Sequence, residues 1–300
     1  MSPNVRNKIQ FVSQGKRADI GLYKIDRLLP NRYVEAIGPF VFLDHLLPAK
    51  HDKQSLQQKV EGTGPHPHRG IATLTYVLNG EAEHYDSKGH HANVRSGGVQ
   101  WMKAGNGIIH DESMKADDLS DELITHSFQF WINLPAKNKA EEADYLPLQA
   151  YEIPRKELPN GSGWIKVIAG DYEELTSKIP SYTSQFIYHL HLEGGHFFTL
   201  KTSDLVEYAA FLPQQDAVVN DTDYQTGELL VFDRASGEID IKNVSLRPID
   251  VILFGGEPYT EPIVAAGPFV MNTEYEISLA YNDYYKGNYG KIEYDEKNLP

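Results

Sequence analysis

The chain of 300 residues contains no cysteine. Disulfide bridges, cysteine-bound zinc, cysteine-bound iron–sulfur clusters and catalysis by a thiol are therefore excluded. Any metal site must take its ligands mainly from histidine, aspartate and glutamate, and the chain has 12 histidines and 42 acidic residues. The spacing of these side chains along the sequence therefore decides whether a metal site can form.

Long apolar runs and an excess of basic residues are also missing. Residues 1–8 lack the apolar core of a signal peptide, and no apolar run approaches the roughly 20 residues of a membrane span. The 42 acidic residues outnumber 28 basic ones, and a formal net charge of −14 would repel a phosphate backbone. We therefore expect a cytoplasmic protein that binds neither a membrane nor nucleic acid directly.

Short apolar runs separated by turn-forming residues dominate residues 66–132. The pair Asn79-Gly80 accepts the positive φ of a type I′ turn, so we expect a tight hairpin between the runs on either side of it. Further turns are expected at residues 86–89 and 96–98. Several short strands at a spacing of roughly 8–12 residues predict a sandwich or barrel and not a βαβ fold.

The length of the chain predicts two domains, since one compact domain typically has about 100–150 residues. Residues 136–148 are rich in charged residues and are the best linker candidate. Strand-rich segments of similar length lie on both sides of this linker, which indicates a duplicated barrel. We therefore expect a first barrel in residues 1–135 and a second barrel in residues 149–300.

One helix is expected near the C-terminus. Thr273 and Glu276 form a capping-box pattern, which typically starts a helix. Ile277 and Ala280 then fall on one face, and Gly287 supplies the stop. The expected fold is therefore all-β apart from this C-terminal helix.

Two pairs of potential metal ligands share the same spacing. His66 and His68 lie two residues apart, as do His110 and Glu112, and residues two apart on a strand share a face. Three imidazoles and one carboxylate suit Fe(II), Mn, Ni, Cu or Zn, and not Ca or Mg. A His-x-His pair also occurs by chance on solvated strands, so the spacing alone supports a metal site and a surface role about equally.

Other histidines have less specific surroundings. His84, His90 and His91 lie at or beside predicted hairpin turns, where solvated surface histidines are expected. His189 and His191 form a second His-x-His pair, with Glu193 and His196 nearby, but no separate His-x-Glu segment follows, so packing or surface roles are favoured. Asp44 and His45 either orient a metal-bound histidine or serve a structural role at a strand end.

Several segments resemble the pirin family of bicupins. They are His66-Pro67-His68-Arg69-Gly70, the run from Gln100 to Glu112, the run from Gly38 to His45, and the run from Gly267 to Thr273. The resemblance implies two cupin barrels of the double-stranded β-helix (jelly-roll) type. It also implies that His66, His68, His110 and Glu112 hold a non-haem metal in the first barrel and that the second barrel carries none. Many cupins have a glutamate soon after His-x-His, but Ile71-Ala72-Thr73 stands here. The resemblance to pirins implies that the acidic ligand is Glu112 instead.

The resemblance further implies a function. The implied function is similar to that of quercetin 2,3-dioxygenase, a metal-dependent oxidoreductase that acts on flavonol-like aromatic substrates. The implied cofactor is one divalent metal. Fe(II) is the first expectation, and Ni, Cu, Mn and Zn are compatible alternatives. In this interpretation Glu112 is also the catalytic base. The alternative is a non-enzymatic iron- and redox-sensing regulatory protein that acts through protein partners. Other cupin chemistry, such as oxalate oxidation or sugar-phosphate isomerisation, would use the same ligands.

Overall fold

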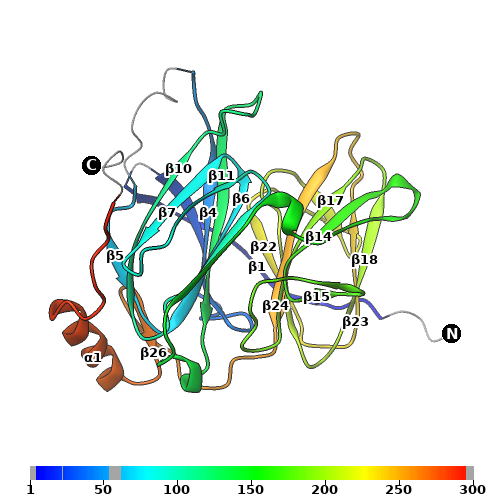
Figure 1. The fold of residues 1–300 in the computed structure, drawn as a ribbon. Helices are drawn as coiled ribbons and strands as arrows, with labels where there is room; N and C mark the ends of the chain where they lie inside the picture. Colours follow the sequence, from blue (N-terminus) through cyan, green and yellow to red (C-terminus); the bar gives the residue numbers. More distant parts are fainter. Residues whose placement is uncertain (1–4, 22, 54–61, 295–300) are drawn as a thin grey trace. The chain divides into compact units, whose positions relative to one another are not determined.

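The computed structural model describes residues 5–21, 23–53 and 62–294 (Figure 1). The chain forms two compact units. The first unit takes residues 17–27, 41–152 and 260–300 as far as they are described, and the second takes the described residues up to 16 together with 28–40 and 153–259. Strand pairings in both units are antiparallel, which confirms the expected all-β class.

The first unit contains two large sheets and a small one. The seven-stranded sheet has the spatial order β12 (Asp144–Leu148), β9 (Val99–Lys103), β6 (Ile71–Asn79), β11 (Ile124–Asn133), β4 (Phe40–Lys50), β3 (Tyr23–Leu29) and β2 (Lys16–Ile20). The four-stranded sheet has the order β5 (His66–His68), β10 (Ile108–Lys115), β7 (Glu81–Asp86) and β8 (His91–Arg95). The small sheet pairs β25 (Val264–Ala266) with β26 (Phe269–Met271), and a 3-10 turn covers Ala136–Asn138.

The second unit repeats this plan. Its seven-stranded sheet has the order β1 (Ile9–Gln14), β22 (Glu228–Phe232), β19 (Glu207–Phe211), β24 (Ile249–Gly256), β17 (Gln185–Leu192), β14 (Gly163–Ala169) and β13 (Arg155–Glu157). The four-stranded sheet has the order β18 (Phe197–Thr202), β23 (Gly237–Lys242), β20 (Ala217–Val219) and β21 (Thr222–Tyr224). A small hairpin pairs β15 (Asp171–Tyr172) with β16 (Leu175–Thr176), and 3-10 turns cover Ala150–Glu152 and Pro159–Gly161.

Side-chain alternation explains where the core of the second unit lies. On β17, Tyr188, Leu190 and Leu192 belong to its hydrophobic core cluster. His189 and His191 lie between them in sequence and therefore point to the opposite face of the strand. The period of two thus separates apolar core positions from polar positions on the same strand.

The expected hairpin at Asn79-Gly80 is wrong. The strands on either side of Gly80 belong to different sheets, since β6 pairs with β9 and β11 whereas β7 pairs with β8 and β10. Gly80 has φ +108°, and a Cβ there would lie 2.7 Å from the carbonyl oxygen of Lys115. The glycine therefore serves a corner at which the chain passes from one sheet to the other. The turn at residues 86–89 does join a hairpin, between β7 and β8.

The two units do not follow a contiguous division of the chain. Strand β1 pairs with β22 in the second unit, although it lies in the segment expected to form the first barrel. Residues 260–300, as far as they are described, belong to the first unit, and β12 within the expected linker pairs with β9. Backbone pairing between segments distant in sequence causes these differences. The division into a first barrel at residues 1–135, a linker at 136–148 and a second barrel at 149–300 remains a prediction.

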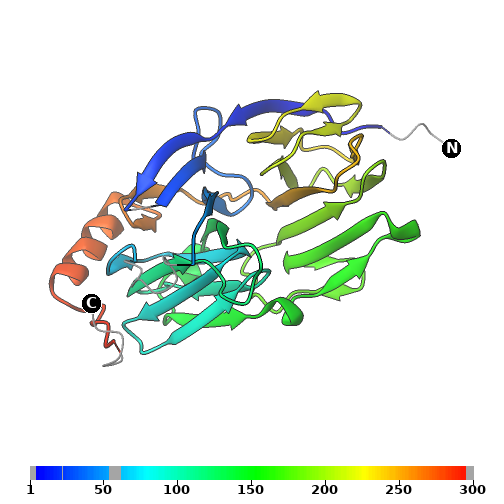
Figure 2. The same cartoon turned by 90° about the horizontal axis from the view of Figure 1, so that it is seen from above.

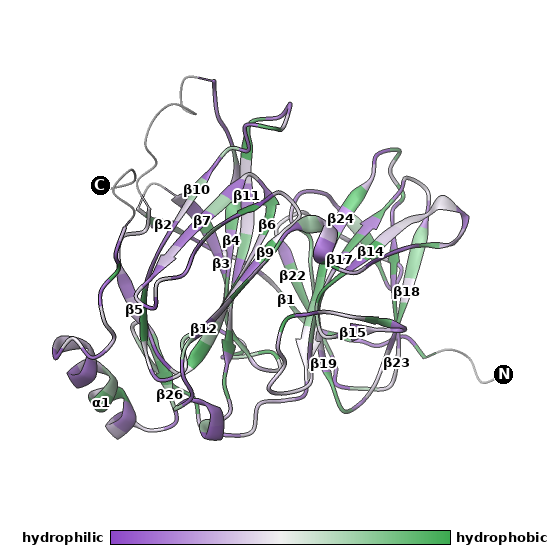
Figure 3. Ribbon diagram, in the orientation of Figure 1, coloured by the Kyte–Doolittle hydropathy of each residue, from purple (hydrophilic) through white to green (hydrophobic). Residues whose placement is uncertain are grey.

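The C-terminal helix forms as expected. Helix α1 (Glu274–Tyr285) is drawn in orange in Figure 2. Its N-cap is Thr273, whose hydroxyl accepts a hydrogen bond from the Glu276 amide at 3.2 Å. Green hydrophobic and purple hydrophilic residues are interleaved along it in Figure 3, and Ile277 and Ala280 are its buried positions. Gly287 follows with φ +78°. Within the described ranges, no helix is both long enough and apolar enough to cross a membrane.

Candidate metal centre

The two ligand pairs lie on adjacent strands of the four-stranded sheet (Figure 1). Strands β5 and β10 run antiparallel, with His66 opposite His110 and His68 opposite Ile108. Because alternate residues share a face, this register brings the imidazoles of both strands to the same side. The spacing seen in the sequence therefore places three histidines at one point of the fold.

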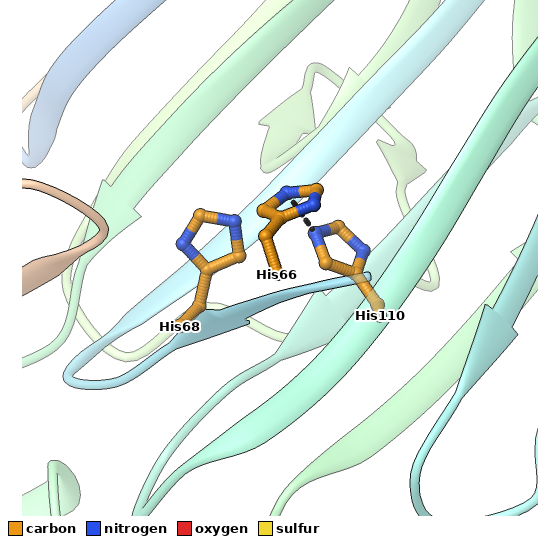
Figure 4. Close-up of side chains that lie close together, drawn as sticks. All are labelled: His66, His68 and His110. Atoms are coloured by element: carbon orange, nitrogen blue, oxygen red, sulfur yellow. Dashed lines mark hydrogen bonds between the residues drawn. The ribbon is translucent and has the colours of Figure 1, made fainter. Parts of the chain in front are cut away.

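The imidazoles of His66, His68 and His110 form a compact triad (Figure 4). One ring nitrogen of each lies within 4.8 Å of those of the other two. Nε2 of His110 lies 3.0 Å from Nε2 of His66, and the ring centroids of His68 are 5.1 and 4.9 Å from those of His66 and His110. This convergence of nitrogens is the arrangement in which imidazoles bind a transition metal.

Backbone carbonyls fix the orientation of two of these rings. Nδ1 of His66 lies 2.8 Å from the Gly64 carbonyl oxygen, and Nδ1 of His68 lies 3.0 Å from that of Pro268. Each Nδ1 therefore donates its hydrogen to a carbonyl, so the neutral ring keeps a lone pair on Nε2. Nitrogens with free lone pairs directed at one point fit a metal ion, and the triad can hold one.

Burial favours the uncharged form of two rings of the triad, those of His68 and His110. Burial, together with the neighbouring His66, lowers the pKa of His68 to about 3, although the hydrogen bond to the Pro268 carbonyl opposes the shift. Burial, followed by the charges of neighbouring histidines, also holds the pKa of His110 well below its usual value. Neutral imidazoles are the metal-binding form, so both rings are prepared for coordination at neutral pH.

Glu112 lies beside the triad and not within it. Its carboxylate oxygens accept hydrogen bonds from the side-chain amides of Gln100 at 2.6 Å and Gln129 at 2.7 Å, and from the Thr75 hydroxyl at 3.3 Å. One oxygen is 3.9 Å from Nδ1 of His110. The structure thus groups three of the four expected ligands, and it places Glu112 in contact with one of them.

His84 contradicts the expected surface position. Its side chain is fully buried, its Nε2 bonds Asp86 at 3.1 Å, and its ring stacks on Tyr145 at 4.1 Å. It lies opposite Glu112 in the register of β7 and β10, and its ring nitrogen lies within 4.8 Å of His110 and Glu112. The position of His84 beside a predicted hairpin turn gave no sign of this burial, because the contact with Tyr145 joins segments about 60 residues apart.

The neighbouring histidines behave as expected for a surface. The side chains of His90 and His91 are 37% and 34% exposed, and they bond Asp86 at 2.8 Å and Glu83 at 3.0 Å. His45 instead lies 2.7 Å from His126 through Nε2 atoms, with its pKa lowered to about 3 by burial. His45 therefore has a buried structural environment and does not contact the triad histidines in these pairings.

The second His-x-His pair shares a carboxylate. In the second unit, His189 and His191 lie 2.8 and 2.7 Å from the same oxygen of Asp250. Within the described residues, the clusters with metal-binding spacing do not include this pair. Trp164 contacts both rings, at 4.8 and 5.0 Å between centroids, so the arrangement supports a packing role.

A cavity of about 380 Å³ opens beside the triad, entirely within the first unit. His66, His68 and Glu112 line one side of it. Apolar and aromatic side chains line much of the rest, namely Ile20, Tyr23, Ile25, Phe42, Leu46, Ala82, Met114 and Trp131. A pocket of this size with a few converging polar groups fits a small aromatic molecule.

Comparisons with known proteins agree with this geometry. Residues 23–132 match the family model described as Pirin, and residues 187–290 match that of the Pirin C-terminal cupin domain. Pirin-1 of Arabidopsis thaliana is 33% identical over 291 residues, covering 94% of this chain and 92% of that protein. A Pseudomonas aeruginosa protein named "Putative quercetin 2,3-dioxygenase" is 32% identical over 259 residues, covering 86% of this chain and 89% of that protein.

A solved structure is similar over almost the whole chain. The crystal structure of quercetin 2,3-dioxygenase from Acinetobacter baumannii at 1.88 Å superposes with a TM-score of 0.87 and 28% identity. The match covers 96% of this chain and 100% of that one. The expected architecture of two cupin-like sheet domains and a C-terminal helix is therefore confirmed.

Proposed function

Because this chain belongs to the pirin family, we propose that it is a metal-dependent dioxygenase of the quercetin 2,3-dioxygenase type that acts on flavonol-like aromatic substrates. The observation that carries the proposal is that two histidines of the triad, His66 and His68, line a cavity of about 380 Å³ whose other walls include aromatic side chains. The names of the similar P. aeruginosa and A. baumannii proteins support the same activity.

We assign the metal to His66, His68 and His110, with Glu112 as the fourth ligand. Fe(II) is our first choice, and Ni, Cu, Mn and Zn suit the same donors. A bound metal would act as a Lewis acid, lowering the pKa of a substrate hydroxyl. The carbonyls of Gly64 and Pro268 hold two of the imidazoles in the binding tautomer.

Glu112 also has the position of a catalytic base. It lines the cavity, and its carboxylate is held by the amides of Gln100 and Gln129. These donors orient the carboxylate while leaving lone pairs that can accept a proton from a substrate hydroxyl. The aromatic side chains of the cavity stack on a flat substrate and displace water from it.

The second candidate function is a non-enzymatic iron- and redox-sensing protein that acts through protein partners. The net charge of −14 favours this class over one that binds DNA directly. A sensor would bind the metal at the same triad but would not consume oxygen with an aromatic substrate. The composition also favours a cytoplasmic location for either function.

Anaerobic loading with Fe(II), followed by oxygen-uptake measurements, tests the proposal. We expect quercetin to cause uptake that oxalate and a substrate-free sample do not. His66→Ala should abolish both metal content and uptake, because it removes one ligand. His191→Ala, which changes the other His-x-His pair, should retain both. Bound iron without quercetin-dependent uptake would favour the sensor, and equal metal loss in both variants would refute the assigned site.

A further inference from the structure

A row of stacked groups runs along one wall of the cavity, away from the triad. The Trp131 ring meets the His68 ring edge-on at 4.9 Å and stacks on Phe42 at 4.2 Å with an interplanar angle of 15°. The guanidinium of Arg27 lies over the other end of this row, 4.3 Å from the Phe42 centroid. All four side chains line the cavity. A flat ligand that reaches the triad at one end can therefore lie along this wall toward Arg27.

An ion pair ends the wall. Nε of Arg27 donates a hydrogen bond to Oδ1 of Asp44, and Nη2 donates one to Oδ2, both at 2.9 Å. Asp44 is only 4% exposed at its side chain, whereas Arg27 is 36% exposed. Alternation on β3 and β4 directs both side chains into the cavity, together with Ile25 and Phe42.

This pair keeps unused hydrogen-bonding capacity. A guanidinium has five N–H donors and a carboxylate about four lone-pair positions, and the bidentate contact uses two of each. A spare donor and a spare acceptor therefore lie side by side at the end of an apolar wall. A hydroxyl group matches both, since its oxygen accepts from Arg27 and its hydrogen donates to Asp44. A carboxylate would be repelled by Asp44, and a ring without a polar substituent would leave the pair poorly solvated.

We propose that Arg27 and Asp44 select ligands with a phenolic hydroxyl on the ring farthest from the metal-binding oxygen. This assignment deepens the proposed function, on which it rests for the position of the other end of the ligand. It names the substrate class as hydroxylated aromatic compounds with polar groups at both ends. A neutral hydroxyl is preferred over a methoxy group, which only accepts, and over a carboxylate.

Binding of matched flavonols tests this selection without turnover. The probes are 3-hydroxyflavone and its 4′-hydroxy, 4′-methoxy and 4′-carboxy derivatives, titrated by tryptophan fluorescence quenching into Zn(II)-loaded and metal-free protein. We expect the 4′-hydroxy compound to bind about tenfold more tightly than 3-hydroxyflavone, as one hydrogen bond to a charged group allows. The methoxy and carboxy compounds should lack most of this gain.

Variants identify the residues responsible. In the double variant Arg27→Met, Asp44→Leu, the 4′-hydroxy compound and 3-hydroxyflavone should bind about equally tightly. Replacing both residues leaves no unpaired buried charge. Arg17→Met is the matched control, since Arg17 pairs with Asp26 outside the cavity lining, at 2.6 Å, and should keep the full preference. If the double variant unfolds, Asp44→Asn should still shift the preference toward the methoxy compound.

The outcomes separate this inference from the proposed function. No preference for the 4′-hydroxy compound in the wild type, or an unchanged preference in the double variant, would overturn the role of Arg27 and Asp44. A preference that depends on Arg27 and Asp44 in protein that consumes no oxygen with quercetin would support the selection while refuting the dioxygenase. Oxygen uptake without any preference would refute the selection alone.

Discussion

Lys139 is a buried lysine whose replacement should change stability in a pH-dependent way. Its side chain is almost fully buried and its ammonium nitrogen lies 2.8 Å from the carbonyl oxygens of Gly70 and Val270 and 2.5 Å from Oδ1 of Asn133. Gly70 lies two residues after His68, just beyond the end of β5. Lys139 therefore fastens the ligand-bearing strand to the C-terminal segment of the first unit.

The effect of burial on the pKa of Lys139 sets the expected change in the free energy of unfolding with pH. Burial lowers the pKa of Lys139 to about 7 from its ordinary value of 10.5, while Glu261 and Glu276 oppose the shift. A lowered pKa means that the unfolded chain binds the proton more tightly, so stability rises with pH between the folded and unfolded values. One pKa unit corresponds to about 1.4 kcal/mol, so the free energy of unfolding should gain about 2–3 kcal/mol from about pH 7 to about pH 9 through this group.

Urea unfolding of the wild type and Lys139→Met at these two pH values measures that gain. Methionine cannot titrate, so the difference between the two proteins should grow in favour of the wild type as the pH rises. Lys137→Met, an exposed position on the same turn, should show no such change. A difference that stays constant with pH would mean that the three oxygen acceptors keep the ammonium charged, which would refute the reasoning.

Three further perturbations have defined outcomes. Gly107→Ala should destabilise the protein by about 1–3 kcal/mol in thermal unfolding, because its φ is +122° and a Cβ would lie 2.1 Å from the Tyr289 ring; an unchanged melting temperature would contradict this contact. Thr273→Ala should cost about 1 kcal/mol by removing the helix cap, and Thr273→Ser should restore it. Burial alone would raise the pKa of Asp250, but hydrogen bonds from His189 and His191 hold it well below its usual value. Asp250→Asn should therefore cost stability at neutral pH, and its difference from the wild type should shrink below about pH 4; a difference that grows in acid would refute the sign.

Local patterns predicted the ligand-bearing strands well. The two-residue spacing of His66 and His68 needs only the geometry of an extended strand, and the structure confirms that the rings share a face. The cap at Thr273 is equally local and is also confirmed. In both cases the residues that decide the outcome lie within four positions of each other.

Sheet membership could not be predicted in this way. An Asn-Gly pair fits a hairpin turn and a passage from one sheet to another equally well. Only the distant pairing partners of β6 and β7 decide between the two. The environment of His84 likewise depends on distant segments, since its ring stacks on Tyr145 of β12 and lies beside the ring of His110 on β10. The ring row from His68 to Arg27 likewise joins four strands, and no short window of sequence contains it.

The hydrogen bond between Nδ1 of His68 and the Pro268 carbonyl joins residues 200 positions apart. Synthesis proceeds from the N-terminus, so the triad-bearing strands leave the ribosome long before the carbonyl that orients His68. A nascent chain ending before Pro268 would contain all three imidazoles, yet the His68 ring would lack its fixed tautomer. We therefore expect tight metal binding only after the segment that contains Pro268 has been synthesised and has folded against His68.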